Sequence, residues 1–369
     1  MSTSLLRIQC LCGSSASTIS LPSSSLPLQT YLCHCNISRH ISGCLCSSYA
    51  RYPPLSQTPR PDLSALTAYR SSDILTRYFC TTCGTHMYLE YDDDGHFEIA
   101  TGLLAGLAVD PDRPPMSIVK HVGHMWIEDT EDGGASDWIS DLNGKSAERW
   151  MRGANSNDTG MLFARCYCGG VEFAISRPDS ESCVHDGTAD FPDLLVPYNS
   201  EKSAKNPDGK PWWLSNDGRR YTAGTCACDS CRRAAGFEIV EWAFVPAGNI
   251  MVPELRDASE PPIWRKYEVG REFGTGLLQS FSSSDRVFRR FCGGCGANIF
   301  WESYNRPYII DVAVGILRAP EGARAETWLE WVTDRVSFCE EGANPGLVYD
   351  LTRGLEGWGK RLSLVSMIP

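Results

Sequence analysis

The sequence contains no apolar run long enough to span a membrane. Its first residues, MSTSLLRIQCLCG, also lack the continuous apolar core of a secretory signal peptide, and a cysteine pair falls where that core would be. Both absences predict a soluble, intracellular protein in the cytoplasm, with the nucleus left open. Disulfides are scarce in such compartments, so the 17 cysteines point to metal binding.

Positive charge is also in deficit, because 34 Lys and Arg residues face 45 Asp and Glu residues, for a net charge of −11. This balance argues against a broad phosphate-binding surface and therefore against a nucleic-acid partner.

Long helical periodicity is scarce too. Short runs rich in β-branched and aromatic residues, at 170–176, 238–245 and 298–304, instead predict a mainly β fold. With 369 residues, the chain is long enough for two domains.

The cysteines that are present recur in the same order in two parts of the chain. The first part contains Cys10-x-Cys12-Gly, Cys33-x-Cys35 and Cys80-x-x-Cys83-Gly, and the second contains Cys166-x-Cys168-Gly, Cys226-x-Cys228 and Cys292-x-x-Cys295-Gly. Three motifs in a repeated order indicate one domain present twice. We therefore expect a first half at 1–145 and a second half at 160–369, joined near 143–160.

Two motifs of each half together supply four thiolates. A CxC pair and a CxxC pair make a closed tetrahedral zinc site, which clips distant segments of chain together. The predicted structural zinc ligands are Cys10, Cys12, Cys80 and Cys83 in the first half, and Cys166, Cys168, Cys292 and Cys295 in the second. The alternative for each set is unbound, reduced thiols.

Three thiols of the second half remain, at Cys226, Cys228 and Cys231. Three protein ligands with one open position are typical of catalytic zinc, so we expect three zinc ions per chain. Arg232 and Arg233 follow directly. They could offset the negative charge of such a site or hold a carboxylate substrate, and the alternative is that both are solvated surface charges.

The first half departs from this pattern, because Ser38 stands where the third thiol would be. A neutral hydroxyl is a poor zinc ligand, so the simpler interpretation is a decayed site. Cys33 and Cys35 stay candidate metal ligands. A fourth zinc ion would need substitutes such as Cys44 and Cys46, which follow shortly.

Smaller features have competing explanations. Trp212 and Trp213 lie in a long insertion and could form a lid, although anchoring that insertion to the core is the simpler role. His34 stands between two candidate ligands, but neighbouring side chains usually diverge. The acidic run at 92–95 predicts a hairpin turn, with a calcium loop as the alternative.

The second-half motifs together resemble the glutathione-dependent formaldehyde-activating enzyme and centromere protein V family. The residues concerned are Cys166-x-Cys168-Gly-Gly, Cys226-x-Cys228-x-x-Cys231-Arg with Gly236, and Phe291-Cys292-x-x-Cys295-Gly296. The resemblance covers both halves. It implies two tandem, mainly β zinc domains of the β-tent type, with the division between structural and catalytic zinc described above.

The family prototype joins glutathione to formaldehyde, so the resemblance implies a zinc-dependent carbon–sulfur lyase that acts on a thiol adduct of a small aldehyde. A thiol such as glutathione would occupy the open position beside Cys226, Cys228 and Cys231 as a thiolate. Two alternatives stay open. One is a zinc-stabilised binding module without turnover, whose protein partner is unknown, and the other is a redox switch at the three thiols.

Overall fold

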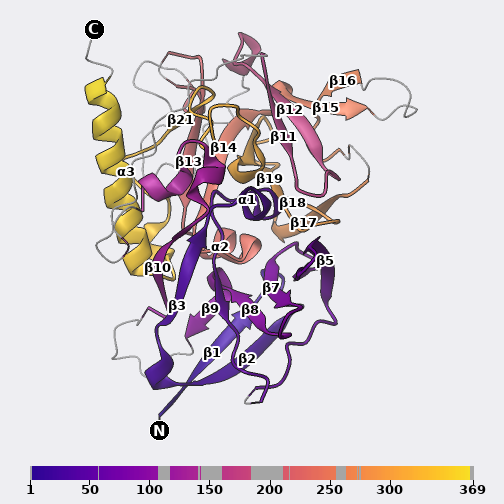
Figure 1. The fold of residues 1–369 in the computed structure, drawn as a ribbon. Helices are drawn as coiled ribbons and strands as arrows, with labels where there is room; N and C mark the ends of the chain where they lie inside the picture. Colours follow the sequence, from indigo (N-terminus) through magenta and orange to yellow (C-terminus); the bar gives the residue numbers. More distant parts are fainter. Residues whose placement is uncertain are drawn as a thin grey trace.

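The computed structural model describes residues 2–56, 58–106, 117–139, 142, 160–183, 211–215, 217–254, 263–271, 273 and 276–365. These residues form 21 strands in five sheets, and only three α-helices, so the predicted mainly β fold is confirmed. Figure 1 shows the first half of the chain in the lower part of the molecule and the second half in the upper part. The expected join at 143–160 lies, apart from its last residue, outside the described residues.

The first half contains three sheets. A three-stranded sheet has the order β2-β1-β9, two parallel strands have the order β10-β3, and a five-stranded sheet has the order β4-β8-β7-β6-β5. Their bounds are β1 Thr3–Gln9, β2 Ala16–Pro22, β3 Leu28–Cys33, β4 Tyr49–Arg51, β5 Leu66–Ser72, β6 Leu75–Cys80, β7 His86–Tyr91, β8 Phe97–Ala100, β9 Leu104–Gly106 and β10 Val119–Met125.

The second half contains a four-stranded sheet of order β11-β12-β15-β16 and a seven-stranded sheet of order β17-β18-β19-β20-β14-β13-β21. The bounds are β11 Met161–Arg165, β12 Glu172–Ser176, β13 Tyr221–Cys226, β14 Val240–Pro246, β15 Ile250–Glu254, β16 Ile263–Lys266, β17 Leu278–Ser284, β18 Val287–Cys292, β19 Asn298–Ser303, β20 Ile309–Ala313 and β21 Leu329–Trp331.

The strand pairing follows the same pattern in both halves. The antiparallel run β5-β6-β7-β8 joins β4, and the run β17-β18-β19-β20 joins β14. Strand β3 pairs in parallel with β10, just as β13 pairs in parallel with β21. In both halves, strands end at cysteine motifs. Strands β6 and β18 end at Cys80 and Cys292, the first cysteines of the CxxC motifs. Strands β3 and β13 end at Cys33 and Cys226, the first cysteines of the second CxC motif in each half.

Two short helices, α1 (Asn36–Ser42) and α2 (Asp229–Ala235), lie in the middle of the molecule (Figure 1). Each ends at a glycine in the left-handed conformation, Gly43 or Gly236. The carbonyl of Gly43 accepts the N–H of Gly315 at 2.8 Å, and the carbonyl of Gly236 accepts the N–H of Gly102 at 2.9 Å. Each helix is therefore docked on the half to which it does not belong.

The third helix, α3 (Pro345–Val365), is a long helix that the sequence analysis did not predict. Leu347, Leu351, Leu355 and Trp358 are buried at helical spacing, and Trp358 packs against Trp138 of the first half with ring centroids 5.7 Å apart. Four glycines interrupt this stretch, which weakens the helical pattern in the sequence. Among the described residues, no helix is both long and apolar enough to cross a membrane.

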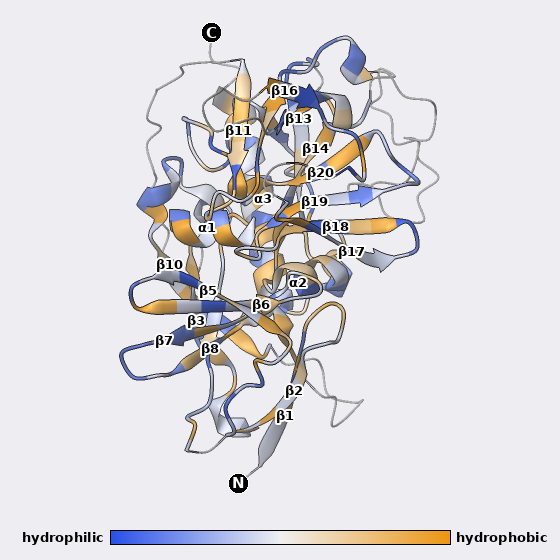
Figure 2. Ribbon diagram, turned by 90° about the vertical axis from the view of Figure 1, so that its right-hand side faces the viewer, coloured by the Kyte–Doolittle hydropathy of each residue, from blue (hydrophilic) through white to orange (hydrophobic). Residues whose placement is uncertain are grey.

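One hydrophobic core contains residues of both halves. Strands β14 and β20 are buried at every position, and Figure 2 shows hydrophobic colouring along them. A buried carboxyl group, Glu241, lies within this core and accepts the N–H of Leu45 from the first half at 2.8 Å. The interface between the two halves, here called the seam, is therefore packed like a protein interior.

Candidate metal centres and cavity

Two clusters of four thiols form where the CxC and CxxC motifs meet. In each cluster the sulfur atoms all lie within 4.8 Å of one another; the two sets are Cys10, Cys12, Cys80 and Cys83, and Cys166, Cys168, Cys292 and Cys295. Backbone N–H groups point at the sulfurs, as in Ser15 to Cys10 at 3.4 Å and Val171 to Cys166 at 3.3 Å. This donor set fits a closed, tetrahedral thiolate site, and either cluster could hold a metal ion.

The third cluster consists of Cys226, Cys228 and Cys231, whose sulfurs also lie within 4.8 Å of one another. Cys226 ends β13, and Cys228 precedes α2, where its sulfur accepts the N–H of Cys231 at 3.2 Å. All three are buried. Within the described part of the chain, no fourth Cys, His, Asp or Glu joins them.

A buried arginine that the sequence analysis missed lies beside this cluster. Arg289 on β18 is 4% exposed, and its Nη2 lies 3.5 Å from the Cys231 sulfur and 2.8 Å from Ser230 Oγ. Its Nε and Nη1 atoms are buried without a hydrogen-bond partner. Burial acts to lower the pKa of Arg289, but the Cys231 and Cys228 thiolates raise it overall, so the guanidinium stays charged.

The internal repeat of the sequence could have indicated Arg289. Arg289 and Arg77 stand three positions before the first cysteine of their CxxC motifs. Arg232 and Arg233 are the charges next to the three thiols along the chain, whereas β18 brings Arg289 from elsewhere in the fold.

Arg232 and Arg233 have a different role from those expected. Arg232 is buried, pairs with Asp229 and donates to the backbone carbonyl of Gly102. Arg233 donates to the carbonyl of Cys10 at 2.9 Å. Both side chains therefore bind the backbone of the first half, and neither is a fully solvated surface charge.

In the first half, Cys33 and Cys35 lie together with their sulfurs 3.5 Å apart. The Cys35 sulfur accepts the N–H of Ser38 at 3.3 Å, and Ser38 Oγ lies 3.5 Å from the Cys33 sulfur. The hydrogen bond from Cys33 is the main cause that lowers the pKa of Cys35 to about 5. The Arg77 Nη2 donates to Ser38 Oγ at 3.4 Å, so Arg77 occupies the position that Arg289 has in the other half.

The suggested substitute ligands do not join this pair. No group of three or more Cys, His, Asp or Glu ligand atoms in the described residues includes Cys33 or Cys35. Cys44 and Cys46 are core residues, and burial raises the pKa of both thiols. His34 turns away and places its Nε2 2.8 Å from Nδ1 of His124. The alternative that Cys44 and Cys46 substitute for the missing thiol therefore finds no support among the described residues.

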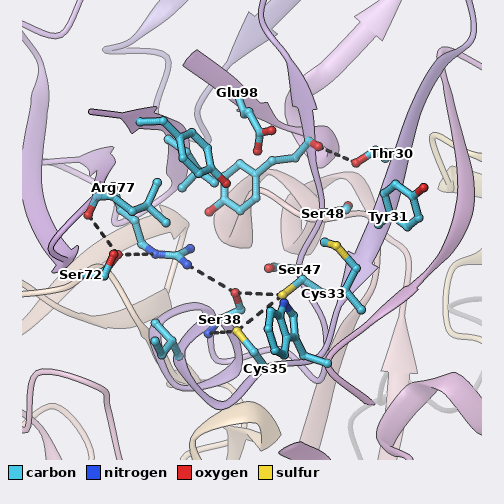
Figure 3. Close-up of a pocket in the computed structure, with 18 of the residues that line it drawn as sticks. Thr30, Tyr31, Cys33, Cys35, Ser38, Ser47, Ser48, Ser72, Arg77 and Glu98 are labelled. Atoms are coloured by element: carbon cyan, nitrogen blue, oxygen red, sulfur yellow. Dashed lines mark hydrogen bonds between the residues drawn. The ribbon is translucent and has the colours of Figure 1, made fainter. Parts of the chain in front are cut away.

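A cavity of about 650 Å³ opens over this pair of thiols. Figure 3 shows the Cys33 and Cys35 sulfurs near Ser38, with the Arg77 side chain reaching towards Ser38 from the opposite wall. The other lining residues include Thr30, Tyr31, Ser47, Ser48, Tyr49, Ser71, Ser72, Tyr91, Glu98, Met125 and Trp126. This cavity was not predicted, and it lies at the site that the sequence suggested had decayed.

The smaller features are placed as follows. Trp212 and Trp213 are buried, and Trp213 Nε1 donates to the carbonyl of Ser182 at 2.8 Å, as the anchoring role expects. The acidic run at 92–95 forms the turn between β7 and β8. Side chains of that turn form an exposed group that could hold a metal ion, namely Asp93, Asp94 and His96.

Comparison with known proteins identifies the first half. Residues 5–128 match the family model described as glutathione-dependent formaldehyde-activating enzyme. These residues are a domain of that family. The segment that matches the family model thus contains one four-thiol cluster, the Cys33–Cys35 pair and the cavity above it.

The match to the family model ends at residue 128. No curated protein matches the chain. A solved structure of a Rhodobacter sphaeroides protein matches 46% of this chain and 99% of its own length, at 14% identity and a TM-score of 0.24. A likeness at this level carries no argument about fold or function.

Proposed function

We propose that this protein is a zinc-dependent carbon–sulfur lyase that makes or breaks the bond between a thiol of the glutathione type and the carbon of a small aldehyde. The observation that carries the proposal is the cluster of Cys226, Cys228 and Cys231, to which the described residues add no fourth ligand. The family model that matches residues 5–128 is described as glutathione-dependent formaldehyde-activating enzyme, and this description supports the same chemistry.

The donor sets suit zinc. Soft thiolates select zinc among the common divalent cations, and two closed four-thiol clusters fit structural sites. At the three-thiol cluster, bound zinc would lower the pKa of a substrate thiol and hold its sulfur ready for the aldehyde carbon. The proposal therefore assigns three zinc ions, one to each all-cysteine cluster.

Arg289 supplies a positive charge and hydrogen-bond donors, which the three thiols lack. Its positive charge, beside Cys231, offsets the negative charge of three thiolates. When a thiolate adds to an aldehyde, the new carbon–sulfur bond leaves charge on the carbonyl oxygen, which then takes up a proton. The unpartnered Nε and Nη1 of Arg289 are donors for that oxygen.

We also propose that the chain consists of two domains of one type, at 1–145 and 160–369. Their matching strand order and cysteine motifs support this division. The second domain retains the complete set of seven cysteines and would carry the reaction. The first retains its four-thiol cluster and provides the surfaces on which α2 and its arginines are docked.

The test combines zinc content with turnover. Elemental analysis should give three zinc ions per wild-type chain and two in Cys231→Ser, while Cys339→Ser, a change at an exposed thiol, should keep three. Carbon-13 exchange spectroscopy with glutathione and labelled formaldehyde should show catalysed exchange in wild type and Cys339→Ser, and none in Cys231→Ser. Two zinc ions in all three proteins would contradict the proposal, and three without catalysis would favour a binding module.

A further inference from the structure

We propose that Cys33 and Cys35 form a redox-active dithiol that exchanges with low-molecular-weight disulfides inside the first-half cavity. Their sulfurs lie 3.5 Å apart, and both residues line the cavity and are partly exposed to it. The Cys33 thiol donates a hydrogen bond to the Cys35 sulfur, which marks Cys35 as the sulfur that attacks first.

The same residues are unsuited to a closed metal site. Ser38 presents a hydroxyl where Cys231 presents a thiol in the other half, and it lies 3.5 Å from the Cys33 sulfur. No other Cys, His, Asp or Glu of the described residues completes a group of three with the pair. Without a third thiolate, the two sulfurs are free for chemistry with each other.

The cavity can admit a small, polar ligand. Its volume of about 650 Å³ lies within the range of small-molecule sites. Hydroxyl groups line it, and that of Ser47 is buried without a hydrogen-bond partner. Arg77 is a buried positive charge on one wall, and Trp126, which is 59% exposed, lies among the residues at the opening. The acidic residues Glu98 and Asp129 also line the cavity, so a peptide-like disulfide with both amino and carboxylate groups suits these features.

The reaction balances in two exchanges. The Cys35 thiolate attacks one sulfur of the disulfide RSSR; that S–S bond breaks, and a mixed disulfide and one thiolate RS⁻ result. Cys33 then loses its proton and attacks the Cys35 sulfur, which forms the Cys33–Cys35 disulfide and releases the second RS⁻. The two protein thiols are oxidised, RSSR is reduced to two thiols, and the two protons pass to the released thiolates.

The experiment uses the zinc-loaded full chain with Cys183→Ser and Cys339→Ser, which removes two exposed thiols. Incubation with glutathione disulfide should release two glutathione molecules per chain, and peptide mapping should show a Cys33–Cys35 disulfide, lighter by two hydrogen atoms. We expect the exchange to be about tenfold faster than that of Cys183 and Cys339 in the unmodified chain. Zinc content should stay unchanged.

Two single variants separate the steps. Cys33→Ser should stop at the mixed disulfide on Cys35 and release one glutathione, and Cys35→Ser should react at no more than the rate of the exposed thiols. The absence of a Cys33–Cys35 disulfide in the folded, zinc-loaded protein would overturn the proposal. So would an additional zinc ion that is lost in both variants. Neither outcome depends on catalysis at the three-thiol cluster.

Discussion

Arg289 and Arg77 are single residues at matching places in the two halves, each buried beside the short helix that follows a CxC motif. Arg289 contacts a sulfur, Cys231, whereas Arg77 contacts a hydroxyl, Ser38. The charge of an arginine beside three thiolates compensates part of their mutual repulsion, while the same charge beside a hydroxyl has no metal site to support.

Arg289→Met should therefore weaken zinc binding at the three-thiol cluster by about 10- to 100-fold, because a group that contacts a ligand tunes the metal site. The shape of the side chain is largely kept, but its charge and donors are lost. Competition with a chromophoric chelator measures the affinity of the weakest of the three ions.

Arg77→Met is the matched control, since it removes a buried arginine from the same position of the first half. It should leave all three zinc affinities unchanged. Equal losses in both variants would mean that the arginines act only through general stability, and the assigned role of Arg289 would then be rejected.

The residues of the clusters were predictable, because ligand spacing in a CxC or CxxC motif is a property of the chain itself. The thiols assigned to each cluster are the ones the structure brings together. Arg289 and the cavity were not found, since both depend on side chains that meet only in the folded sheet. Ser38 was recognised as a departure from the three-thiol motif, but no pattern in the sequence indicates the cavity above it.

At the scale of elements, the helix ends position the clusters. Gly236 ends α2 with φ of 89°, and a Cβ there would lie 2.4 Å from the carbonyl oxygen of His86. Gly43 ends α1 in the same way, where a Cβ would lie 2.6 Å from the carbonyl oxygen of Asn298. Only glycine satisfies both the conformation and the close approach.

Gly236→Ala should lower the free energy of unfolding by at least about 3 kcal/mol, because left-handed strain and a steric clash act together. Gly95→Ala is the matched control: its φ is also positive, at 67°, but no atom lies within 4 Å of the added Cβ. It should cost only about 1 kcal/mol. Chemical denaturation measures both, and equal losses would show that the contact with the first half contributes nothing.

Most strands were predictable because alternating or β-branched runs bury one face or both. The predicted runs at 170–176 and 298–304 contain β12 and β19, and the run at 238–245 covers β14 except for its last residue, Pro246. Helix α3 was missed, since its buried face consists of a few large residues separated by glycines. Packing against Trp138, rather than local propensity, stabilises it.

On the scale of the whole molecule, the seam between the halves contains a titratable group. Burial raises the pKa of Glu241 to about 8. An unfolded glutamate titrates near 4.3, so between these pH values the folded chain holds a proton that the unfolded chain has released. The free energy of unfolding therefore falls as the pH rises through this window.

Glu241→Gln keeps an acceptor for the N–H of Leu45 and removes the titration. Between about pH 6 and about pH 8.5, wild type should lose on the order of 3 kcal/mol of stability relative to this variant. Denaturant unfolding at the two pH values measures the difference. Parallel pH profiles for both proteins would contradict the prediction.

The reciprocal docking of α1 and α2 has an evolutionary consequence. In a symmetric pair of separate, identical chains, every substitution appears at both equivalent sites. Here a single polypeptide contains both halves, so a codon for one site can change while its counterpart is preserved. If the chain is two domains of one type, as proposed above, Ser38 in one half and Cys231 in the other are diverged counterparts, and covalent fusion is the condition that lets selection act on each of them separately.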